Sequence, residues 1–450
     1  MDIDQLKNLV ESGEVETIII ASTDMQGRLC AKRLTGRHFL ENTNQGIGTC
    51  SVILGWGQDH SVDYGYDFTS WDLGYPDLVV KPDLNTIRWY PWFEKTVLIL
   101  GDLIGINGEI ISISPRAILK KMISKLRDSS FNPYFVSEIE CYLLKETPLT
   151  AFDKGFVNLN IKHKTMHPET LSRISEDEEF LGPLRHNLEI ANIPVESVKA
   201  EYAPGQIEIN LAYSDAITAA DRHVIFKAGT KEEALKQNLI STFMAKPWDT
   251  LGGSSCHIHL SLYDEEGKNL FYEKNNKDSS SELMHYFLGG LITYVNDIFL
   301  FFAPNINSYK RLVPGTFAPS SVTWGEDNRT VAFRFVGNEK SRRIENRIPG
   351  ADINPYLAYS GMIAAGLQGI KEKIKTTDKA ETGNAYNKSV NKYLPQSLEE
   401  ATEIFKNSNF IKSIFGEEVQ KHYSNYGKQT VLASKNIVTD YERRILLTDI

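Results

Sequence analysis

The sequence predicts an α+β fold in which helices cover an antiparallel sheet. Segments that alternate apolar and polar residues occur at 134–144, 206–211 and 256–262, and each has the length of a strand. Longer segments between and after them carry apolar residues on one helical face. No internal repeat of fixed period is visible. These patterns favour one antiparallel sheet with helices packed on it.

Composition limits the classes of function that the chain can have. Its 450 residues suffice for one large domain and a smaller one. The net charge of −9 argues against a nucleic-acid surface. The acidic N-terminal segment does not resemble a signal peptide, and the most apolar stretch, 291–304, is too short to cross a bilayer. Four widely spaced cysteines without a CxxC pair indicate reduced thiols in a cytoplasmic protein.

The first part of the chain reads as short strands and turns after an opening helix. Its turn at Asp24–Gly27 and its β-branched run at 17–21 are the clearest signals. The predicted strands are 17–21, 28–33, 97–100 and 110–113. We place a boundary inside 101–114, so that a small β-rich domain spans residues 1–108 and a larger domain spans 109–450.

Helix signals dominate the larger domain outside its strands. Ser114 and Pro115 are an N-cap and a proline at the first helical position, and the apolar spacing continues to about Arg127. Another helix is predicted from Asn354-Pro355 to about residue 375, with small residues that permit close packing. The remaining predicted helices are 214–228, 231–238 and 281–302.

Four glutamates in two short motifs are candidate ligands for divalent cations. Glu138 and Glu140 in VSEIECYLL are two residues apart on a strand and therefore lie on one face. Glu201 and Glu208 flank a Pro-Gly turn that brings two segments together. The alternatives are a solvated strand face for the first motif and an ordinary hairpin for the second. Either motif alone is a weak signal.

A histidine pair and a fifth glutamate extend this set. His257 and His259 in GGSSCHIHLSL share one strand face, and Glu345 stands in RRIENRIPG. Zinc would need further soft ligands at short spacing, and none is present. Carboxylates with one imidazole suit Mg²⁺ or Mn²⁺. A core or hydrogen-bonding role is the alternative for the histidines, above all for His259.

Arginines are concentrated in the segments around Glu345. They are Arg311, Arg329, Arg334, Arg343 and Arg347. The planar guanidinium group binds carboxylate and phosphate, and such groups beside bound cations are what phosphoryl transfer needs. Surface ion pairs are the alternative for any one of them. Neither a P-loop nor a GxGxxG motif is present, so an ATP site would be of another kind.

Read in order, six segments resemble the glutamine synthetase family. They are SEIECYL, EYAPGQIEIN, STFMAKPWDTLGGSSCHIHLSL, NSYKRLVPG, DNRTVAFR and RIENRIPGADINPYLA. The resemblance covers nearly the whole chain. It implies an N-terminal β-grasp domain, a larger catalytic domain, and a homo-oligomer, commonly a dodecamer of two stacked hexameric rings with active sites between neighbouring subunits.

The resemblance also implies a role for each matching residue. ATP would phosphorylate the γ-carboxylate of glutamate, and an amine would then attack the acyl phosphate, with two or more Mg²⁺ or Mn²⁺ ions in each site. The implied ligands are Glu140, Glu201 and Glu208 for one cation, and Glu138, His257 and Glu345 for another. The implied glutamate contacts are Arg311, Arg347 and the backbone of Gly253. His259, Arg329 and Arg334 would contact the phosphates, and Arg329 and Arg347 would be catalytic.

Three departures from the family pattern concern the acceptor. Phe317 stands where ammonia-using members carry a flap glutamate, and the segment GIGTCSVILGWGQD lacks an acid before Asp59. Gly252 replaces an asparagine that contacts glutamate. An ammonium ion needs carboxylates, whereas an aromatic side chain suits an organic amine. We therefore expect a γ-glutamyl amide as product, as in the polyamine- and alkylamine-using branch, with Phe317 binding the amine. The alternatives are synthesis of glutamine from ammonia and a catalytically silent regulatory relative.

Overall fold

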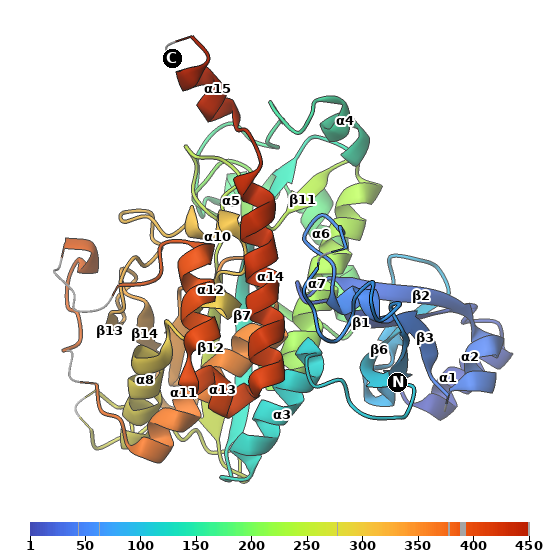
Figure 1. The fold of residues 1–450 in the computed structure, drawn as a ribbon, viewed down its shortest axis with the longest axis horizontal. Coiled ribbons are helices and arrows are strands. Elements are labelled where there is room, and N and C mark those ends of the chain that lie inside the picture. The colour runs from blue at the N-terminus through green and yellow to red at the C-terminus, as the bar shows by residue number, and fades with distance from the viewer. Residues whose placement is uncertain (44, 63, 277, 377–378, 388–392, 449–450) are drawn as a thin grey trace.

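A computed structural model describes residues 1–450 except 44, 63, 277, 377–378, 388–392 and 449–450. Two sheets with helices packed around them confirm the α+β class (Figure 1). The strands are β1 (Thr17–Thr23), β2 (Leu29–Thr35), β3 (Ile47–Cys50), β4 (Asp77–Pro82), β5 (Arg88–Trp89), β6 (Thr96–Gly105), β7 (Asn132–Leu144), β8 (Val195–Ala200), β9 (Gln206–Leu211), β10 (Ser214–Asp215), β11 (Ile240–Thr242), β12 (Cys256–Tyr263), β13 (Trp324–Glu326), β14 (Phe333–Val336) and β15 (Arg343–Asn346).

The α-helices lie mostly in the second half of the chain (Figure 1). They are α1 (Ile3–Glu11), α2 (Gly36–Asn42), α3 (Pro115–Arg127), α4 (Pro148–Asp153), α5 (Leu171–Ser175), α6 (Glu178–Ile190), α7 (Ala216–Lys236), α8 (Glu282–Tyr294), α9 (Phe299–Phe302), α10 (Ile306–Tyr309), α11 (Pro355–Glu372), α12 (Leu398–Asn407), α13 (Asn409–Phe415), α14 (Glu417–Lys435) and α15 (Asp440–Leu446). Among the described residues, no helix is long and apolar enough to span a membrane.

The N-terminal sheet contains β1 to β6 in the order β2-β1-β6-β4-β3, with β5 also paired to β6. β1 runs parallel to β6 and antiparallel to β2. The β-branched run at the start of β1 lies in the middle of this sheet, where its isoleucines are buried. Helix α1 begins with a capping box between Asp2 and Gln5. The predicted boundary between residues 108 and 109 and the β-grasp assignment stay predictions.

The second sheet has nine strands in the order β13-β14-β15-β12-β7-β9-β8, with β10 and β11 paired to β7. All of its pairs are antiparallel except β13 with β14. One face of β7 is apolar and buried, and there Phe135 stacks on Tyr359 of α11 with ring centroids 4.2 Å apart. The other face carries the even-numbered residues, which include Glu138 and Glu140.

Small residues let α8 and α11 pack closely, as the sequence predicts. A Cβ atom added at Gly290 would lie 2.0 Å from the carbonyl oxygen of Ala365. One added at Gly366 would lie 2.1 Å from the Phe287 ring. Any side chain at either position would force the two helices apart. Tyr359 of α11 packs in turn on Phe135, on the buried face of the second sheet.

Three predicted elements differ from those in the structure. α7 continues through Gly229, where two helices were expected, because the missing side chain leaves room for the ring of Trp92. The expected helix 281–302 is broken between α8 and α9, where the Asn296 amide donates to the Tyr393 carbonyl and Asp297 accepts from Ser408. Residues 110–113 form only an isolated bridge between Ile110 and Ile104.

Candidate active site

Five of the six predicted cation ligands lie, with three other polar residues, in one line across the second sheet, which we call the ligand row. Its members, in order from β14 to β8, are Arg334, Glu345, His259, His257, Glu138, Glu140, Glu208 and Lys199. Strand register brings them together, since Glu345 is opposite both Arg334 and His259, and Glu208 is opposite both Glu140 and Lys199. Directly opposed side chains are about 5 Å apart at Cβ. Residues as far apart in the chain as Glu138 and Glu345 therefore meet on one face.

Glu140, Glu201 and Glu208 form the first carboxylate cluster. One ligand oxygen of each lies within 4.8 Å of the others. Glu201 comes from the turn that precedes β9, as its position beside the Pro-Gly turn predicts. The Lys199 ammonium lies 2.8 Å from Glu201 Oε2 and 3.4 Å from Glu208 Oε2. The ammonium group of Lys199 therefore already pairs with two carboxylates of this cluster.

The pKa values in the first cluster show that its negative charge is incompletely balanced. Burial, together with repulsion by Glu201, raises the pKa of Glu140 to about 7, although Ser255 donates to its carboxylate. Burial and repulsion by Glu140 and Glu138 raise the pKa of Glu208 to about 8. A hard divalent cation coordinated by oxygen would offset this repulsion. The residues present fit Mg²⁺ or Mn²⁺.

Glu138, Glu345 and the two histidines form the second cluster. Ligand atoms of Glu138, His259 and Glu345 lie within 4.8 Å of one another. His257 Nδ1 lies 3.4 Å from Glu138 Oε2 and 3.5 Å from Glu345 Oε1. Two imidazoles thus face the same carboxylates, whereas the sequence assigned only His257 to the cation. The ligand assignments stay predictions, and either imidazole could complete this site.

Charge in the second cluster differs from that in the first. Burial acts to raise the pKa of Glu138 and of Glu345, but interactions with His259 and His257, and at Glu345 also with Arg347, prevail and lower both, that of Glu345 to about 2. Burial and Arg347 lower the pKa of His257 to about 4. Its imidazole is therefore neutral at pH 7, which is the form that binds metal ions. This cluster is ionised and ready to accept a cation.

The four arginines with predicted roles lie in different surroundings. Arg334 Nη1 lies 2.9 Å from Glu345 Oε2, and Arg347 contacts Glu345 Oε1. Arg311 is buried, and its two terminal nitrogens donate to the carbonyl oxygens of Ile348 and Arg347. Arg329 is exposed in the loop between β13 and β14. Arg334 therefore belongs to the ligand row, Arg347 lies beside it and Arg311 lies behind it, whereas Arg329 lies apart on its loop.

Gly253 supports Arg311 through its lack of a side chain. A Cβ atom there would lie 2.6 Å from Arg311 Cγ and 2.7 Å from the Ala245 carbonyl oxygen. At Gly252 the nearest atoms to an added Cβ are 3.6 Å away, so a side chain would fit at that position. The predicted backbone contact of Gly253 with the acid substrate stays a prediction. The open space at Gly252 lies where the family asparagine would stand.

A cavity of about 350 Å³ opens beside the second cluster and contains residues that sequence reasoning missed. Tyr134, Tyr213 and Tyr263 line it, and the Tyr134 ring lies 4.8 Å from that of Tyr263. Lys340 and Arg343 line its other side, and Arg343 Nε donates to His259 Nδ1 over 3.0 Å. Alternation could have identified Tyr134 and Tyr263, because they share strand faces with Glu138 and His259.

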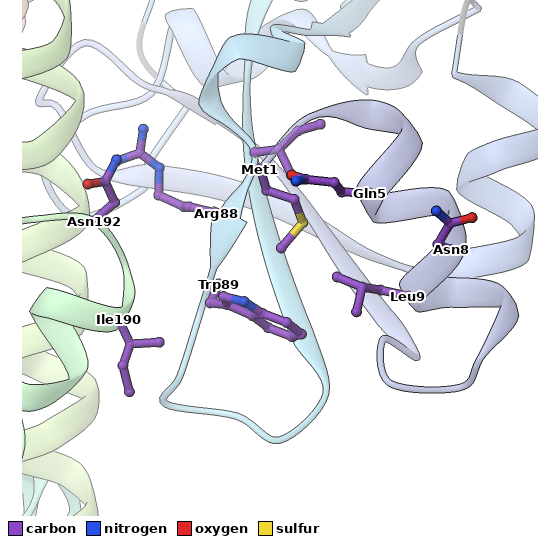
Figure 2. A pocket seen from close by; sticks show the side chains of 9 residues that line it. Met1, Gln5, Asn8, Leu9, Arg88, Trp89, Ile190 and Asn192 are labelled. Atoms are coloured by element: carbon purple, nitrogen blue, oxygen red, sulfur yellow. The ribbon is translucent and has the colours of Figure 1, made fainter.

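A second cavity, of about 590 Å³, lies apart from the ligand row, between α1, β5 and the end of α6 (Figure 2). Figure 2 shows Arg88 and Trp89 on one side of it and the α1 residues Gln5, Asn8 and Leu9 on the other. Its lining includes no acidic residue and no histidine. It is the larger cavity, but it lacks groups for metal-assisted or acid–base chemistry. The candidate active site is therefore the ligand row and the smaller cavity.

Comparison with known proteins agrees with this geometry. The sequence profile described as "Glutamine synthetase, catalytic domain" matches residues 112–446. Over 445 residues the chain is 38% identical to gamma-glutamylethanolamide synthetase GlnA4 of Streptomyces coelicolor, which covers 99% of this chain and 95% of that protein. It is 36% identical over 443 residues to glutamate–isopropylamine ligase of a Pseudomonas species, covering 97% and 96%.

A solved structure shares the whole architecture. The protein described as a GmaS/ADP complex superimposes with a TM-score of 0.85 at 25% identity, over 98% of this chain and 99% of the other. The likeness thus extends from the N-terminal sheet to the C-terminal helices. It includes every segment of the ligand row.

Proposed function

The chain belongs to the glutamine synthetase family, among its glutamate–amine ligases, and from this premise we propose the reaction that it catalyses. ATP phosphorylates the γ-carboxylate of glutamate, and an organic amine then displaces phosphate from the acyl phosphate to give a γ-glutamyl amide. The observation that carries this proposal is the ligand row, with two carboxylate clusters whose members Glu138 and Glu140 are neighbours on one strand face. Their spacing along the strand is roughly 7 Å.

The two clusters suit two divalent cations, Mg²⁺ or Mn²⁺. When bound, such cations neutralise phosphate oxygens and polarise the carboxylate that is being phosphorylated. Arg334 and Arg347 already contact Glu345, so their remaining N–H groups can donate to phosphate or carboxylate oxygens. Buried Arg311, fixed by two carbonyl oxygens, would orient Arg347 and the acid substrate. Arg329 on its exposed loop would contact the transferred phosphoryl group.

We place ATP in the cavity beside the second cluster. Its tyrosines offer aromatic faces for the base, and stacking on such faces is worth about 1–3 kcal/mol per base. Lys340 and Arg343 supply positive charge on the same cavity wall. Arg343 also accounts for the orientation of His259, because its N–H holds Nδ1 as an acceptor and leaves Nε2 toward Glu138. The phosphates would then extend toward the cations.

The homo-oligomer is proposed from an apolar segment at the C-terminal end. Helix α15 has no buried residue, and it projects away from the rest of the chain (Figure 1). Its exposed apolar residues and those next to it are Ile437, Val438, Tyr441, Ile445, Leu446 and Leu447. Exposed apolar surface of this kind marks an interface. We propose that other copies of the chain cover it, in the expected assembly of two stacked hexameric rings.

A cytoplasmic location is also proposed. It is supported by the four cysteines, which are all free. Cys141 and Cys256 are fully buried. Reduced thiols of this kind are typical of a reducing compartment.

The test measures release of ADP by the purified protein with ATP, glutamate and Mg²⁺ or Mn²⁺. Ammonium, isopropylamine, ethanolamine and putrescine are supplied separately, and each product is identified by mass. We expect γ-glutamyl amides with organic amines and slow turnover with ammonium. Strong turnover with ammonium alone would assign the chain to glutamine synthesis instead. The absence of ADP release with every acid and acceptor tested would indicate the silent relative.

A further inference from the structure

Two exposed aromatic side chains meet at the rim of the first carboxylate cluster. Tyr202 and Phe317 are 51% and 56% exposed, and their rings contact edge to face with centroids 6.2 Å apart and planes at 61°. They are 115 residues apart in the chain, so no local pattern pairs them. Aromatic rings that are half exposed and preassembled in this way form an apolar surface to which a further group can bind.

The position of Tyr202 is fixed by the turn that holds the cluster. It directly follows Glu201, whose backbone N–H donates to the Gln206 carbonyl over 3.0 Å. The Gln206 side chain accepts from the Ala203 N–H and donates to Glu140 Oε2 over 2.9 Å. The backbone on both sides of Tyr202 is therefore tied to two carboxylates of the cluster. Tyr202 therefore stands directly beside Glu201, a predicted ligand of the first carboxylate cluster.

Phe317 is placed by the flap that follows Arg311. Thr316 Oγ1 donates to the Val313 carbonyl over 2.6 Å and closes this turn. Phe317 itself has a φ of +57°, in the left-handed region that bulky residues rarely adopt. In this conformation its ring reaches Tyr202. The pair thus joins the flap to the turn that carries Glu201.

Charge around the pair selects the kind of amine. The segment from Pro304 to Gly325 contains no acidic residue, and neither does the stretch from Tyr202 to Ile207. On the flap side the nearest charged residues in sequence, Lys310 and Arg311, are basic, whereas on the other side Lys199 is paired with Glu169, Glu201 and Glu208. A second ammonium group on the amine would meet no carboxylate of the flap, where the exposed side chain of Lys310 would repel it. An uncharged chain would bury apolar surface there.

We propose that Tyr202 is a specificity-determining residue that, with Phe317, binds the chain of a primary monoamine with a short uncharged alkyl or hydroxyalkyl group. Diamines and polyamines are excluded as good acceptors. This inference rests on the proposed ligase reaction, in which the amine nitrogen attacks the acyl phosphate and loses a proton while phosphate leaves. The aromatic pair takes no part in bond formation. It orients the amine and excludes water from its alkyl chain.

The experiment compares acceptors and variants under one set of conditions with saturating ATP, glutamate and Mg²⁺. For the wild type, kcat/KM for ethylamine, isopropylamine and ethanolamine should exceed that for putrescine and spermidine. Tyr202→Ala should raise the KM for these monoamines about tenfold, the effect expected from losing contact with one to three methylene groups. The KM values for ATP and glutamate should stay within about twofold, because neither substrate touches the pair.

Matched variants separate the pair from a general loss of structure. Tyr202→Leu keeps apolar bulk and should lose less than Tyr202→Ala. The effects of Tyr202→Ala and Phe317→Ala should be less than additive in the double variant, because each removes the same contact. Phe152→Ala removes one ring of another exposed aromatic pair, with Phe156 at 6.4 Å, and should change no KM.

The outcomes distinguish this inference from the proposed function. If the wild type turns over none of the organic amines, both the proposed ligase reaction and the role of the aromatic pair are overturned. The role of the pair alone would be overturned if the wild type uses monoamines well and Tyr202→Ala does not change that turnover. The same holds if Tyr202→Ala lowers turnover equally for monoamines and for ammonium. A wild type that prefers putrescine to ethylamine would overturn the substrate class while leaving the ligase reaction in place.

Discussion

Glu208 shows how a single carboxylate can be costly to the fold and necessary to the site. Burial and the neighbouring glutamates raise its pKa to about 8, and Lys199 is the nearest basic group in the strand register. We expect Glu208→Gln to leave the melting temperature of the metal-free protein unchanged or higher, because repulsion with Glu140 disappears. The dissociation constant of the Glu208→Gln variant for Mn²⁺ should be at least about tenfold higher than that of the wild type. Calorimetry or electron paramagnetic resonance measures it.

The matched control for this prediction is Glu403→Gln, which removes an exposed carboxylate on α12. It should change neither the melting temperature nor the affinity for Mn²⁺. A Glu208→Gln protein that binds Mn²⁺ as tightly as the wild type would contradict the first carboxylate cluster as a cation site.

Phe317 is the residue at which the acceptor preference can be reversed. Glutamate at this position would place a carboxylate where an ammonium ion needs one, and the backbone already tolerates a non-glycine residue with positive φ. We expect Phe317→Glu to raise kcat/KM for ammonium by roughly tenfold and to lower it for isopropylamine. Phe317→Gln is the uncharged control, and an equal gain for ammonium in that variant would show that charge is not the cause.

The sequence revealed those residues whose role depends on local pattern. Glu138 and Glu140 could be placed on one face because strand alternation has a period of two. Tyr202 was missed because its partner Phe317 lies 115 residues away. Arg343 stood among the arginines of its segment without a role, and its hydrogen bond to His259 depends on the register of β12 and β15. Such contacts follow from strand order, which alternation does not specify.

Elements were predictable where their end signals are local. α3 begins at Pro115 and ends at Arg127, as its proline and apolar spacing indicate. The break between α8 and α9 was not predictable, because there Asn296 donates to Tyr393 and Asp297 accepts from Ser408, and both partners lie far along the chain. The continuity of α7 through Gly229 depends likewise on Trp92. Tertiary partners overrode helix propensity in both cases.

Helix α14 contains a histidine whose burial makes the protein sensitive to acid. His422 Nε2 lies 3.1 Å from Met25 Sδ, its ring packs against Tyr66, and burial lowers its pKa to about 3. Because the unfolded state binds this proton near pH 6.5, the stability that neutral His422 contributes is complete above pH 6.5 and is lost as pH falls toward 3. From pH 7 to pH 5 the loss is about 2 kcal/mol.

Urea unfolding of His422→Gln at pH 7 and pH 5 checks this prediction. The variant should be less stable at pH 7, through lost packing, but its stability should fall by about 2 kcal/mol less on acidification than that of the wild type. His186→Gln, which changes an exposed histidine of α6, should keep the wild-type pH dependence. An identical pH dependence for His422→Gln and the wild type would contradict the assignment to His422.

At the scale of the whole molecule, α15 buries none of its side chains on the part of the chain that the structure describes. A capping box between Thr439 and Glu442 starts it, yet it has only seven residues and no buried side chain. Helices this short are marginal in water without tertiary packing. We therefore propose that its apolar residues contact another copy. We expect Tyr441→Ser, Ile445→Ser and Leu446→Ser together to reduce the mass of the assembly, measured by light scattering, to half of the wild-type value or less.

The polar positions of the same helix supply the control. Asp440→Ser, Arg443→Ser and Arg444→Ser change as many residues and should leave the mass unchanged, since ion pairs at exposed positions contribute little. If both triple variants keep the wild-type mass, the apolar residues of α15 are not the interface. If ADP release with glutamate and an amine falls together with the mass, assembly completes the site, as expected for active sites between neighbouring subunits. Full activity in a smaller species would place every catalytic group within one chain.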